Sequence, residues 1–535
     1  VTHVLYCPGS RSAPFAYALE AGSFGGDARA VLDERGAGFA AVGLARTGGL
    51  PAVVVTSGTA VAELAPAVLE ASHARLPLLL LTADRPGELR GVGASQATDQ
   101  AGFFGTHVRA SIDLEPQEVA PSLVGHLARA VAAACGAPSG APGPVQVNVA
   151  FRDPLTPVRP ACDCGDEAGA SFVPRPTRVL AAPAVPVPWE DVVGPAATGL
   201  IVAGEGASLR AREWSEASGF PLLAEPASGA WSAGGVTPFE QTLVASSLGS
   251  EVDAVVVTGR PTLSRPIQAL LARPDVRVVV VDPHAPWVDI SGNAAVVVAD
   301  LEPAREPIRA AQAEWASRVR DAARDAGERI ESLLSAGSGR TMLDLARAVA
   351  ASTSGPLVLG ASNPVRAFDL AVPTLEGRAV HSNRGQAGID GTIATAVGIA
   401  LGSGYAGEAS ASEGERVTAV IGDLTACHDA SSLALASSVR ANLDIVVADD
   451  QGGGIFATLE HGRAASPEAY ERWFGLAQSV DYEALAAAYG VAFARAETPA
   501  QLAQLLETGE AGPRLVHAPV ERAAHLYPAV HDVLS

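Results

Sequence analysis

The sequence predicts an α/β protein with three doubly wound domains whose sheets are mainly parallel. Short runs of valine, isoleucine and leucine alternate along the chain with longer stretches of helical length. The 535 residues are enough for about three domains. A hydrophobic content of 48% supplies large cores, and abundant glycine and alanine favour closely packed layers. We expect domains at 1–155, 190–325 and 341–535, with a proline-rich linker over 156–190.

The first domain is predicted from strands at 4–7, 52–56 and 78–81 and from a small-residue helix at 37–45. A Pro-Gly-Ser-Arg turn follows the first strand and ends at Arg11. Residues 57–60 begin a helix after the second strand. The free N–H groups of that helix suit a polar ligand, although helix capping is the simpler interpretation of these residues.

The second domain is predicted from strands at 199–203, 254–258 and 277–281. Arg260 and Arg265 follow the second of these strands, which places two cations beyond a strand end. A helix over 308–335 carries arginine and glutamate at helical spacing, and we interpret it as a solvated bridging helix.

The third domain is predicted from strands at 357–360, 417–421 and 443–447. We expect one short helix over 430–439 to connect the last two strands. Such a strand–helix–strand unit makes the two strands parallel and places their carboxyl ends on one edge of the sheet. The stretch 460–479 is expected to be mobile.

Carboxylates stand directly after both of these strands. Asp423 follows the first strand, and Asp449 and Asp450 follow the second. Because both strand ends share one edge, we expect Asp423 and Asp450 to hold one cation, and three glycines at 452–454 let backbone carbonyls approach closely. Mg²⁺ wants about six oxygen ligands and takes the remainder from phosphates and water. The alternative, two aspartates that cap turns, is less favoured once the spacing and the glycines are considered together.

Composition excludes several functional classes. The sequence contains no lysine, so all 37 basic residues are arginines. A Walker phosphate loop, a pyridoxal Schiff base and a lysine aldolase each need a lysine amine and are excluded. The net charge of −21 argues against nucleic acid and against anionic membranes. An anionic substrate would need locally concentrated arginines.

Cysteine usage and hydropathy predict the cellular setting. The five cysteines are an odd, scattered set, which favours a reducing compartment over a disulfide framework. We interpret Cys162 and Cys164 as free thiols in a loop and not as a metal site. The sequence shows no signal peptide and no apolar run of about 18 residues. We therefore expect a cytoplasmic protein.

The acidic strand ends carry a resemblance to a known family. Gly422-Asp423, followed after about 26 residues by Asp449-Asp450, resembles the thiamine-diphosphate fingerprint, in which an asparagine pair stands at the second position. The run from Asp449 to Phe456 resembles the menaquinone-pathway branch of the thiamine-diphosphate-dependent enzymes more than the other branches. Further similar stretches occur in the same order along the chain, at 8–12, 33–45, 57–60, 81–89, 362–366 and 383–391.

The resemblance implies roles for individual residues. Asp423, Asp450 and the carbonyl of Gly452 would bind Mg²⁺ (or Mn²⁺), and Glu34 would activate the cofactor from a different subunit. The implied cofactor-binding positions are Glu34, Ser57, Gly58, Thr59, Asp423, Leu424, Thr425, Asp450, Gly452 and Ile455. The implied substrate-binding positions are Ser10, Arg11, Arg85, Gln96, Arg265, Ser362, Arg366 and Arg384, and the implied catalytic positions are Glu34, Arg366 and Arg384.

The resemblance also implies the reaction and the partners. It implies decarboxylation of 2-oxoglutarate and 1,4-addition of the resulting succinyl-semialdehyde carbanion to isochorismate, in a homodimer or homotetramer with active sites between subunits. Both substrates are dicarboxylates, which guanidinium groups bind bidentately. Two alternatives stay open: another thiamine-diphosphate carboligase or decarboxylase that acts on a different 2-oxo acid, and a non-catalytic subunit of the same fold.

Four positions depart from the pattern of the family. Asparagine is frequent where Asp449, Gln451 and Ser95 stand, and a threonine-proline-histidine run is frequent near Gln478. We expect the extra carboxylate of Asp449 to tighten metal binding or to alter its pH dependence. None of the departures affects Glu34 or Asp423. An amino-terminal helix that precedes Pro8 in the family is missing from this sequence, so we expect a chain that begins late.

Overall fold

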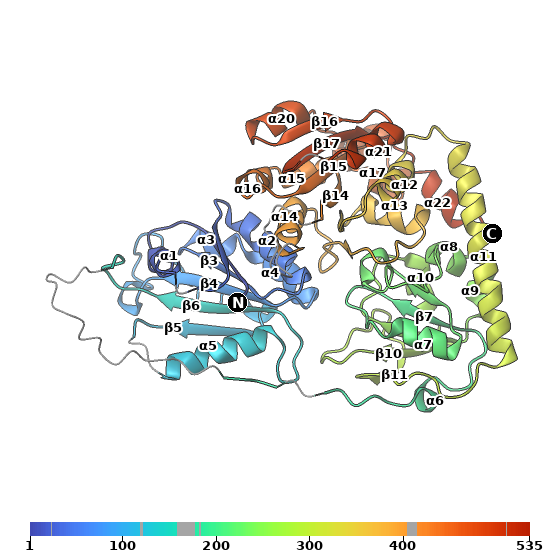
Figure 1. The fold of residues 1–535 in the computed structure, drawn as a ribbon, viewed down its shortest axis with the longest axis horizontal. Helices are drawn as coiled ribbons and strands as arrows, with labels where there is room; N and C mark the ends of the chain where they lie inside the picture. The colour runs from blue at the N-terminus through green and yellow to red at the C-terminus, as the bar shows by residue number, and fades with distance from the viewer. Residues whose placement is uncertain are drawn as a thin grey trace. The chain divides into compact units, whose positions relative to one another are not determined.

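Three β-sheets, with helices between successive strands, form the framework of the protein (Figure 1). The computed structural model describes residues 1–22, 24–117, 121–157, 177–180, 183–403, 415–509 and 511–534. Every pairing of named strands in the three sheets is parallel. The predicted α/β class with mainly parallel sheets is confirmed.

The first sheet has six strands in the order β2-β1-β3-β4-β6-β5. Its strands are β1 (His3–Tyr6), β2 (Asp27–Ala30), β3 (Pro51–Val55), β4 (Leu78–Asp84), β5 (Ala110–Leu114) and β6 (Pro144–Ala150). Its helices are α1 (Ala13–Glu20), α2 (Glu34–Arg46), α3 (Thr59–Ala62), α4 (Ala65–His73) and α5 (Pro121–Ala134), with short 3₁₀ turns at Gly87–Leu89 and Gly105–His107. The central strands are almost entirely buried, as expected of a parallel sheet covered on both faces.

The second sheet has five strands in the order β11-β10-β9-β7-β8. Its strands are β7 (Gly199–Ala203), β8 (Leu222–Ala224), β9 (Ala254–Thr258), β10 (Arg277–Val281) and β11 (Ala294–Val298). Its helices are α6 (Trp189–Val192), α7 (Ala211–Ser218), the 3₁₀ turn η3 (Pro226–Ser228), α8 (Glu240–Ala245), α9 (Ser247–Glu251), α10 (Arg265–Leu271) and α11 (Ala310–Ser335). The three strands predicted here have the predicted bounds.

The third sheet has six strands in the order β13-β12-β14-β15-β17-β16. Its strands are β12 (Leu357–Leu359), β13 (Val380–His381), β14 (Val417–Gly422), β15 (Leu443–Asp449), β16 (Ala492–Arg495) and β17 (Pro513–Pro519). Its helices are α12 (Met342–Ser352), α13 (Asn363–Ala371), α14 (Thr392–Ser403), α15 (Asp423–His428), α16 (Ser432–Ser438), α17 (Gly454–Ala457), α18 (His461–Ala464), α19 (Pro467–Tyr470), the π-helical turn η4 (Glu471–Gly475), α20 (Tyr482–Ala488), α21 (Pro499–Glu507) and α22 (Leu526–His531).

The connection between β14 and β15 corrects the prediction of one crossover helix at 430–439. Two short helices, α15 and α16, stand there, and α15 begins at Asp423 itself. Asp429 separates them, and its side chain accepts a hydrogen bond from the Ser432 hydroxyl at 2.7 Å. The chain therefore turns into a helix immediately after the strand, which holds the Asp423 carboxylate close to the sheet edge.

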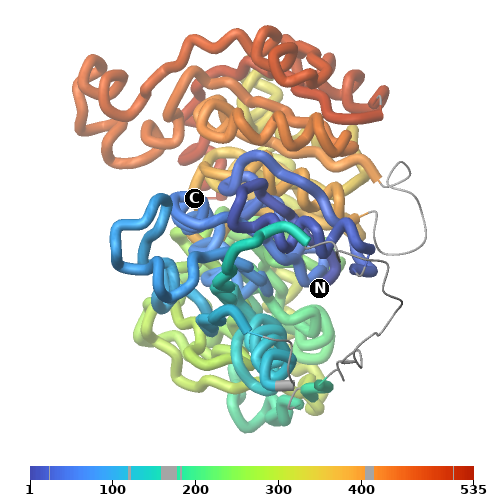
Figure 2. The backbone as a smooth tube through the Cα atoms, turned by 90° about the vertical axis from the view of Figure 1, so that its left-hand side faces the viewer, coloured from blue at the N-terminus to red at the C-terminus, as the bar shows by residue number. Residues whose placement is uncertain are grey.

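The chain divides into two compact units. Figure 2 traces the backbone through both, from blue at the N-terminus to red at the C-terminus. The first unit comprises Val1–Ala182 and Ala394–Ala411, and the second comprises Pro183–Ile393 and Ser412–Ser535. The second unit therefore holds both the second and the third sheet. The predicted division into three domains stays a prediction. Cys162 and Cys164, which we interpreted as loop thiols, lie outside the described residues.

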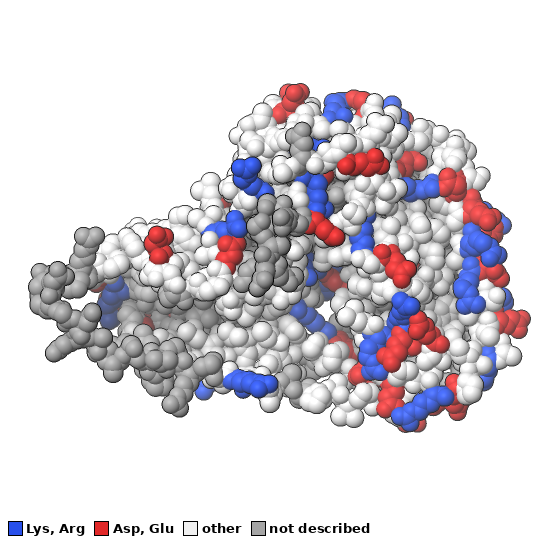
Figure 3. All heavy atoms as spheres, viewed as in Figure 1, with Lys and Arg blue, Asp and Glu red and all other residues white. Residues whose placement is uncertain are grey.

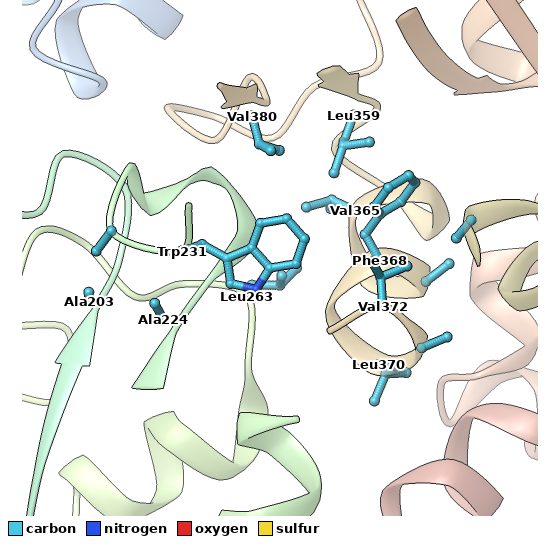
Figure 4. Close-up of a cluster of buried hydrophobic side chains, with 14 of the residues drawn as sticks. Ala203, Ala224, Trp231, Leu263, Leu359, Val365, Phe368, Leu370, Val372 and Val380 are labelled. Atoms are coloured by element: carbon cyan, nitrogen blue, oxygen red, sulfur yellow. The ribbon is translucent and has the colours of Figure 1, made fainter. Parts of the chain in front are cut away.

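A continuous apolar core joins the second and third sheets inside the second unit. Trp231 and Leu263 lie on the side of the second sheet, and they face Val365 and Phe368 of α13 (Figure 4). All four side chains are at least 95% buried. Helix α13 is therefore fixed along its length by the packing of this core.

Helix α11 has one buried and one solvated face, as predicted from its charge pattern. Trp315 and Val319 pack into the core of the second sheet. The outward face carries interleaved charges (Figure 3), including the ion pairs Arg318–Glu251 at 2.5 Å and Arg329–Asp325 at 3.0 Å. No helix in the described ranges combines the length and the apolar character that a membrane span would require.

Candidate cofactor and substrate site

Strands β14 and β15 bring two aspartates to one edge of the third sheet. The strands are parallel neighbours, and Gly422 of one pairs with Ala448 of the other. Asp423 follows β14 at once, and Asp450 follows β15, so both carboxylates lie beyond the carboxyl ends of adjacent strands. This is the edge at which doubly wound folds bind ligands. The parallel pairing and the shared edge that the sequence predicts are therefore present.

The Asp423 carboxylate is buried and incompletely hydrogen-bonded. Its side chain is almost inaccessible, and among the described groups its Oδ2 atom has no hydrogen-bond partner. The backbone N–H groups of Leu424 and Gly452 donate to the carboxylate. The pKa of Asp423 is raised to about 6, chiefly by burial and also by the nearby Asp449 charge, against the effect of those two N–H groups.

The Asp450 carboxylate faces the Asp423 carboxylate within electrostatic reach. Burial and the charge of Asp423 raise the pKa of Asp450 to about 7, while the Arg522 guanidinium lowers it. Arg522 also holds the backbone here, because its Nε donates to the Asp450 carbonyl at 3.1 Å and its Nη2 donates to the Gln451 carbonyl. The buried Asp423 carboxylate opposes ionisation of the half-buried Asp450 carboxylate, and such a pair is suited to share a cation.

The Asp449 side chain is hydrogen-bonded to groups outside this pair. Its Oδ2 lies 2.9 Å from His517 Nε2, and its Oδ1 accepts from the Gln451 N–H at 3.0 Å. The hydrogen bond from His517 lowers the pKa of Asp449, against the opposing effect of burial. The Asp449 charge also raises the pKa of both Asp423 and Asp450. The expectation that Asp449 tightens metal binding or alters its pH dependence stays a prediction.

The three glycines leave no room for side chains. A Cβ on Gly454 would lie 1.9 Å from Asp450 Oδ2, and one on Gly452 would lie 2.0 Å from the Gly475 carbonyl oxygen. Gly452 also has a φ of +124°, which strongly favours glycine. The Gly453 N–H donates to the Gly475 carbonyl at 2.6 Å, and the Tyr470 hydroxyl donates to the Gly453 carbonyl at 2.9 Å. The predicted mobile stretch thus forms helical turns that cover the glycines.

The donor set fits a cation that completes its shell with ligand oxygens. No group of three or more His, Cys, Asp or Glu side chains in the described part of the chain is arranged to hold a metal. Asp423 and Asp450 supply two carboxylates, and Gly452 supplies a carbonyl on the adjoining turn. Such a set is incomplete for Mg²⁺ by itself, so phosphate oxygens and water would supply the remaining ligands.

Several predicted residues meet at the strand ends of the first sheet, in the first unit. The Arg85 guanidinium donates to the Ser57 hydroxyl and, at 2.7 Å, to the Gln96 carbonyl. Gln96 Nε2 in turn donates to the Ser57 carbonyl at 2.9 Å. Arg11 donates to the Phe151 carbonyl at 2.8 Å, and its charge lowers the pKa of Arg85, after the larger effect of burial. Two guanidinium groups therefore lie near one another at this edge.

Glu34 is the first residue of α2, in the first unit. Asp33 caps the helix by accepting from the backbone N–H groups of Arg35 and Gly36. Glu34 itself is partly exposed and lies close enough to the buried Cys7 thiol to raise its pKa. Residues 394–403 of α14 pack against α2 at close range, since a Cβ on Gly398 would lie 2.0 Å from the Ala40 carbonyl oxygen. Helix α2 is thus rigidly held behind Glu34.

The second unit gathers a separate set of three arginines. Arg366 on α13 and Arg384 after β13 both donate to the Ala361 carbonyl, at 3.4 and 3.1 Å. Arg384 also donates to the Thr262 hydroxyl at 3.1 Å. The exposed Arg265, at the start of α10, is near enough to contribute to the lowered pKa of Arg366.

The remaining predicted residues lie on several elements of both units. Ser362 precedes α13, and its carbonyl accepts from Arg366 at 3.0 Å. In the first unit, Ser10 is exposed on a turn and Thr59 is exposed at the start of α3. In the second unit, Thr425 is buried on α15 and Ile455 is half-buried on α17. Leu424 contributes its N–H to Asp423.

Several residues that support the aspartates and the glycine turn were not predicted from the sequence. Arg522 and Tyr470 hold the turn around the glycines, and His517 engages Asp449. Each lies at least 17 residues from its partner in sequence, and no local pattern marks such a pair. A second missed set comprises the buried acids Glu225, Glu240 and Asp369.

Comparisons with known proteins agree with this arrangement. Residues 1–103 match the model of the thiamine pyrophosphate enzyme N-terminal TPP binding domain, and residues 366–518 match that of the C-terminal TPP binding domain. The chain is similar to 2-succinyl-5-enolpyruvyl-6-hydroxy-3-cyclohexene-1-carboxylate synthases. The one from Kineococcus radiotolerans is 43% identical, over 96% of this chain and 92% of the relative. Those from Renibacterium salmoninarum and a Nocardioides species are 39% and 38% identical, each over 98% of this chain and 92% of the relative.

Proposed function

This chain belongs to the family of 2-succinyl-5-enolpyruvyl-6-hydroxy-3-cyclohexene-1-carboxylate synthases, which are thiamine-diphosphate-dependent enzymes, and on that basis we propose that it decarboxylates 2-oxoglutarate and adds the resulting four-carbon unit to isochorismate. This places the protein in menaquinone biosynthesis. One observation carries the proposal beyond the cofactor: the second unit holds three arginines in mutual electrostatic reach, in a protein of net charge −21. Guanidinium groups so concentrated suit a dicarboxylate.

Asp423 and Asp450 would hold Mg²⁺ or Mn²⁺, and the Gly452 carbonyl would be the third protein ligand. Two observations support this assignment: the Oδ2 atom of Asp423 has no hydrogen-bond partner among the described residues, and the charge of Asp423 raises the pKa of Asp450. The cation would bridge to the diphosphate of the cofactor, next to the N–H groups of α15. Ile455, which is half-buried one residue after the glycines, would be the apolar support beneath the thiazolium ring.

Thiamine diphosphate, when bound, supplies a nucleophilic carbon and an electron sink for loss of CO₂. Glu34 would hold a proton at the aminopyrimidine ring, and its place on a rigid helix suits that role. We infer that Glu34 acts on the cofactor held by another copy of the chain, so that a homodimer or a larger homo-oligomer is the active form.

The arginines would bind and orient the two dicarboxylates, and few other protein acids or bases are needed. Arg366 and Arg384 are the positions that we assign to the substrate beside the cofactor, with Ser362 and Arg265 around them. Arg11, Arg85 and Gln96 are the corresponding group of the first unit. Their side chains are held by backbone carbonyls and hydroxyls, and the described hydrogen bonds leave other guanidinium N–H groups to donate to a ligand.

A turnover assay tests the proposal. The protein is loaded with thiamine diphosphate and Mg²⁺ and given 2-oxoglutarate with and without isochorismate, and CO₂ release and the joined product are measured. We expect product only when both substrates are present, and Glu34→Gln should abolish it while cofactor still binds. Use of pyruvate in place of 2-oxoglutarate would overturn the substrate assignment, and activity that survives Glu34→Gln would overturn the role of Glu34. Cofactor binding without any turnover would point to a non-catalytic subunit.

A further inference from the structure

Three carboxyl side chains are buried together behind the arginines of the second unit. Glu225 follows β8, Glu240 begins α8, and Asp369 lies on α13 three residues after Arg366. Their exposed fractions are 3%, 2% and 4%. We call Glu225, Glu240 and Asp369 the carboxyl cluster. Its members come from three different elements, so the fold of the whole second unit is needed to bring them together.

Hydrogen bonds satisfy only part of the carboxyl cluster. Glu225 Oε1 accepts from the Leu263 N–H at 2.5 Å, and Asp369 accepts from the Gln241 amide. Both oxygens of Glu240 lack a hydrogen-bond partner among the described groups. Leu263 also belongs to the apolar core shown in Figure 4, so the surroundings are poor in water. An ionised carboxylate without partners is strongly disfavoured in such a place.

Burial therefore makes the carboxyl cluster retain protons near neutral pH. It raises the pKa of Glu225 to about 8 and that of Asp369 to about 7, and it raises the pKa of Glu240 well above its ordinary value. Asp369 also opposes ionisation of both glutamates, and Glu225 opposes ionisation of Glu240. Around pH 7 the three groups share a partial negative charge and at least one proton.

Arg366 and Arg384 oppose this retention of protons. Arg384 lowers the pKa of Glu225, and both arginines lower that of Asp369. The two guanidinium groups donate to the same Ala361 carbonyl, and the charge of Arg384 contributes to the lowered pKa of Arg366. The other charged or titratable groups that face Arg366 are Arg265 and Tyr527. Negative charge in the carboxyl cluster therefore offsets part of the charge of two cations held side by side.

We propose that binding of a substrate dicarboxylate to Arg366 and Arg384 is coupled to uptake of a proton by the carboxyl cluster Glu225–Glu240–Asp369. This inference rests on the proposed function, because it takes both arginines to be substrate ligands. Before binding, the cluster supplies the counter-charge of the arginines. An arriving carboxylate takes over that role, and the negative charge left in the cluster becomes unfavourable. A proton from solvent then neutralises it, and Asp369 acts as a positioning residue through the arginine one turn away.

Calorimetry on the holoenzyme tests this coupling without turnover. Glutarate is the probe, because it is a five-carbon dicarboxylate without a keto carbon for the cofactor to attack. Titrations at pH 7 in two buffers of different ionisation enthalpy give the number of protons taken up per glutarate bound. We expect a positive fraction of a proton, and an affinity that falls by up to about tenfold per pH unit between pH 7 and 8.5.

Two variants separate the coupling from a structural effect. Asp369→Asn keeps the shape and removes the charge, so proton uptake should fall by about half and the affinity should depend less on pH; Glu225→Gln should act in the same direction. Asp444→Asn is the matched control, because Asp444 is another buried aspartate held by two arginines, Arg416 and Arg514. It lies near the start of β15, away from the carboxyl end of the strand, and should leave proton uptake unchanged.

Each outcome decides the matter. Glutarate binding with no proton uptake by the wild-type protein would overturn the proposal, and so would failure of glutarate to bind or unchanged uptake in both Asp369→Asn and Glu225→Gln. If Asp369→Asn does not fold, Glu225→Gln and the two-buffer measurement on the wild type still decide. Proton-coupled glutarate binding in a protein that does not join 2-oxoglutarate to isochorismate would support the coupling and refute the proposed function.

Discussion

Two aspartates at the edge of the third sheet, Asp423 and Asp450, differ from the neighbouring aspartates in the side chains that hold them. Asp444 and Asp449 are each held by a cationic or hydrogen-bonding side chain, from two arginines and from His517. Asp423 instead accepts from backbone N–H groups, and its charge raises the pKa of Asp450 more than Arg522 lowers it. Ionising two such neighbouring carboxylates costs free energy in the free protein, which favours a site completed by a bound cation.

Replacement of Asp450 by asparagine removes one of the two ligand charges. We expect Asp450→Asn to weaken Mg²⁺-dependent binding of thiamine diphosphate by a factor on the order of 100. Asp449 is the neighbouring residue, and its side chain is engaged with His517. Asp449→Asn should therefore weaken cofactor binding by less than about threefold. Isothermal titration with cofactor at fixed Mg²⁺ measures both. Equal losses in the two variants would contradict the assignment of Asp450 as the ligand.

Protons and the cation compete for the same two carboxylates. The pKa values are about 6 for Asp423 and about 7 for Asp450, so in the metal-free protein one or both hold a proton below pH 6. Mg²⁺ binds the ionised forms, so its affinity should rise with pH from 5.5, by up to about tenfold per unit for each proton displaced, and level off above about pH 8. Titration of Mg²⁺ at four pH values checks this. An affinity that is flat over this range would contradict it.

At the scale of elements, the turn after β15 requires glycine, because a side chain at these positions would collide with neighbouring atoms. Gly454→Ala places a methyl group 1.9 Å from Asp450 Oδ2, which forces the carboxylate to move. We expect cofactor binding to weaken by a factor on the order of 10 to 100, because the ligand loses its place and not its charge. Gly125→Ala is the control, because the new methyl group on α5 would meet only Arg129, at 3.7 Å. A Gly454→Ala protein that binds cofactor normally would contradict this account.

The elements also show what could be predicted from the sequence. Buried strands such as β7, β9 and β10 are short apolar runs bounded by polar residues, and their bounds matched because that signal is local. The break between α15 and α16 was missed, because it depends on Asp429, whose carboxylate accepts from Ser432 and from the Ile393 N–H on a distant segment. Long-range partners of this kind leave no periodic mark in the sequence.

The residues of the candidate site likewise divide into those with a local sequence pattern and those brought together by long-range packing. Asp423, Asp450 and the glycines were found from the sequence because a strand end followed by carboxylates is a local pattern with a physical meaning. Arg522 stands 72 positions from the Asp450 carbonyl that it binds, and Glu225 and Asp369 come from different sheets. Their proximity follows from the packing of the second unit alone, and sequence reasoning had no basis for it.

At the scale of the whole molecule, negative charge is distributed unevenly between surface and interior. Most of the excess acidic side chains are on the surface, where many pair with arginines, as along α11 (Figure 3). A small number are buried with raised pKa values, at the cation site and in the carboxyl cluster. These buried groups, and not the surface charge, should govern how stability changes with pH near neutrality.

The metal-free protein should lose thermal stability as pH rises from 6.5 to 8.5. A carboxyl group in the unfolded chain has a pKa of about 4, whereas the buried groups titrate at about 6 to 8 in the folded protein. The folded state therefore binds more protons in this interval. The stability that these groups contribute is complete below about pH 4 and is lost as pH rises through their folded pKa values. His3, whose pKa burial lowers, opposes this trend but is a single group.

Bound Mg²⁺ and thiamine diphosphate should reduce that loss, because a cation favours the ionised forms of Asp423 and Asp450. Thermal scans at fixed rate, with and without both ligands, measure the two slopes. In the double variant Asp423→Asn/Asp450→Asn, the metal-free decline with pH should become shallower and the ligands should no longer protect. Protection that persists in the double variant would place the cation elsewhere. A melting temperature of the metal-free wild type that rises between pH 6.5 and 8.5 would show that other groups dominate.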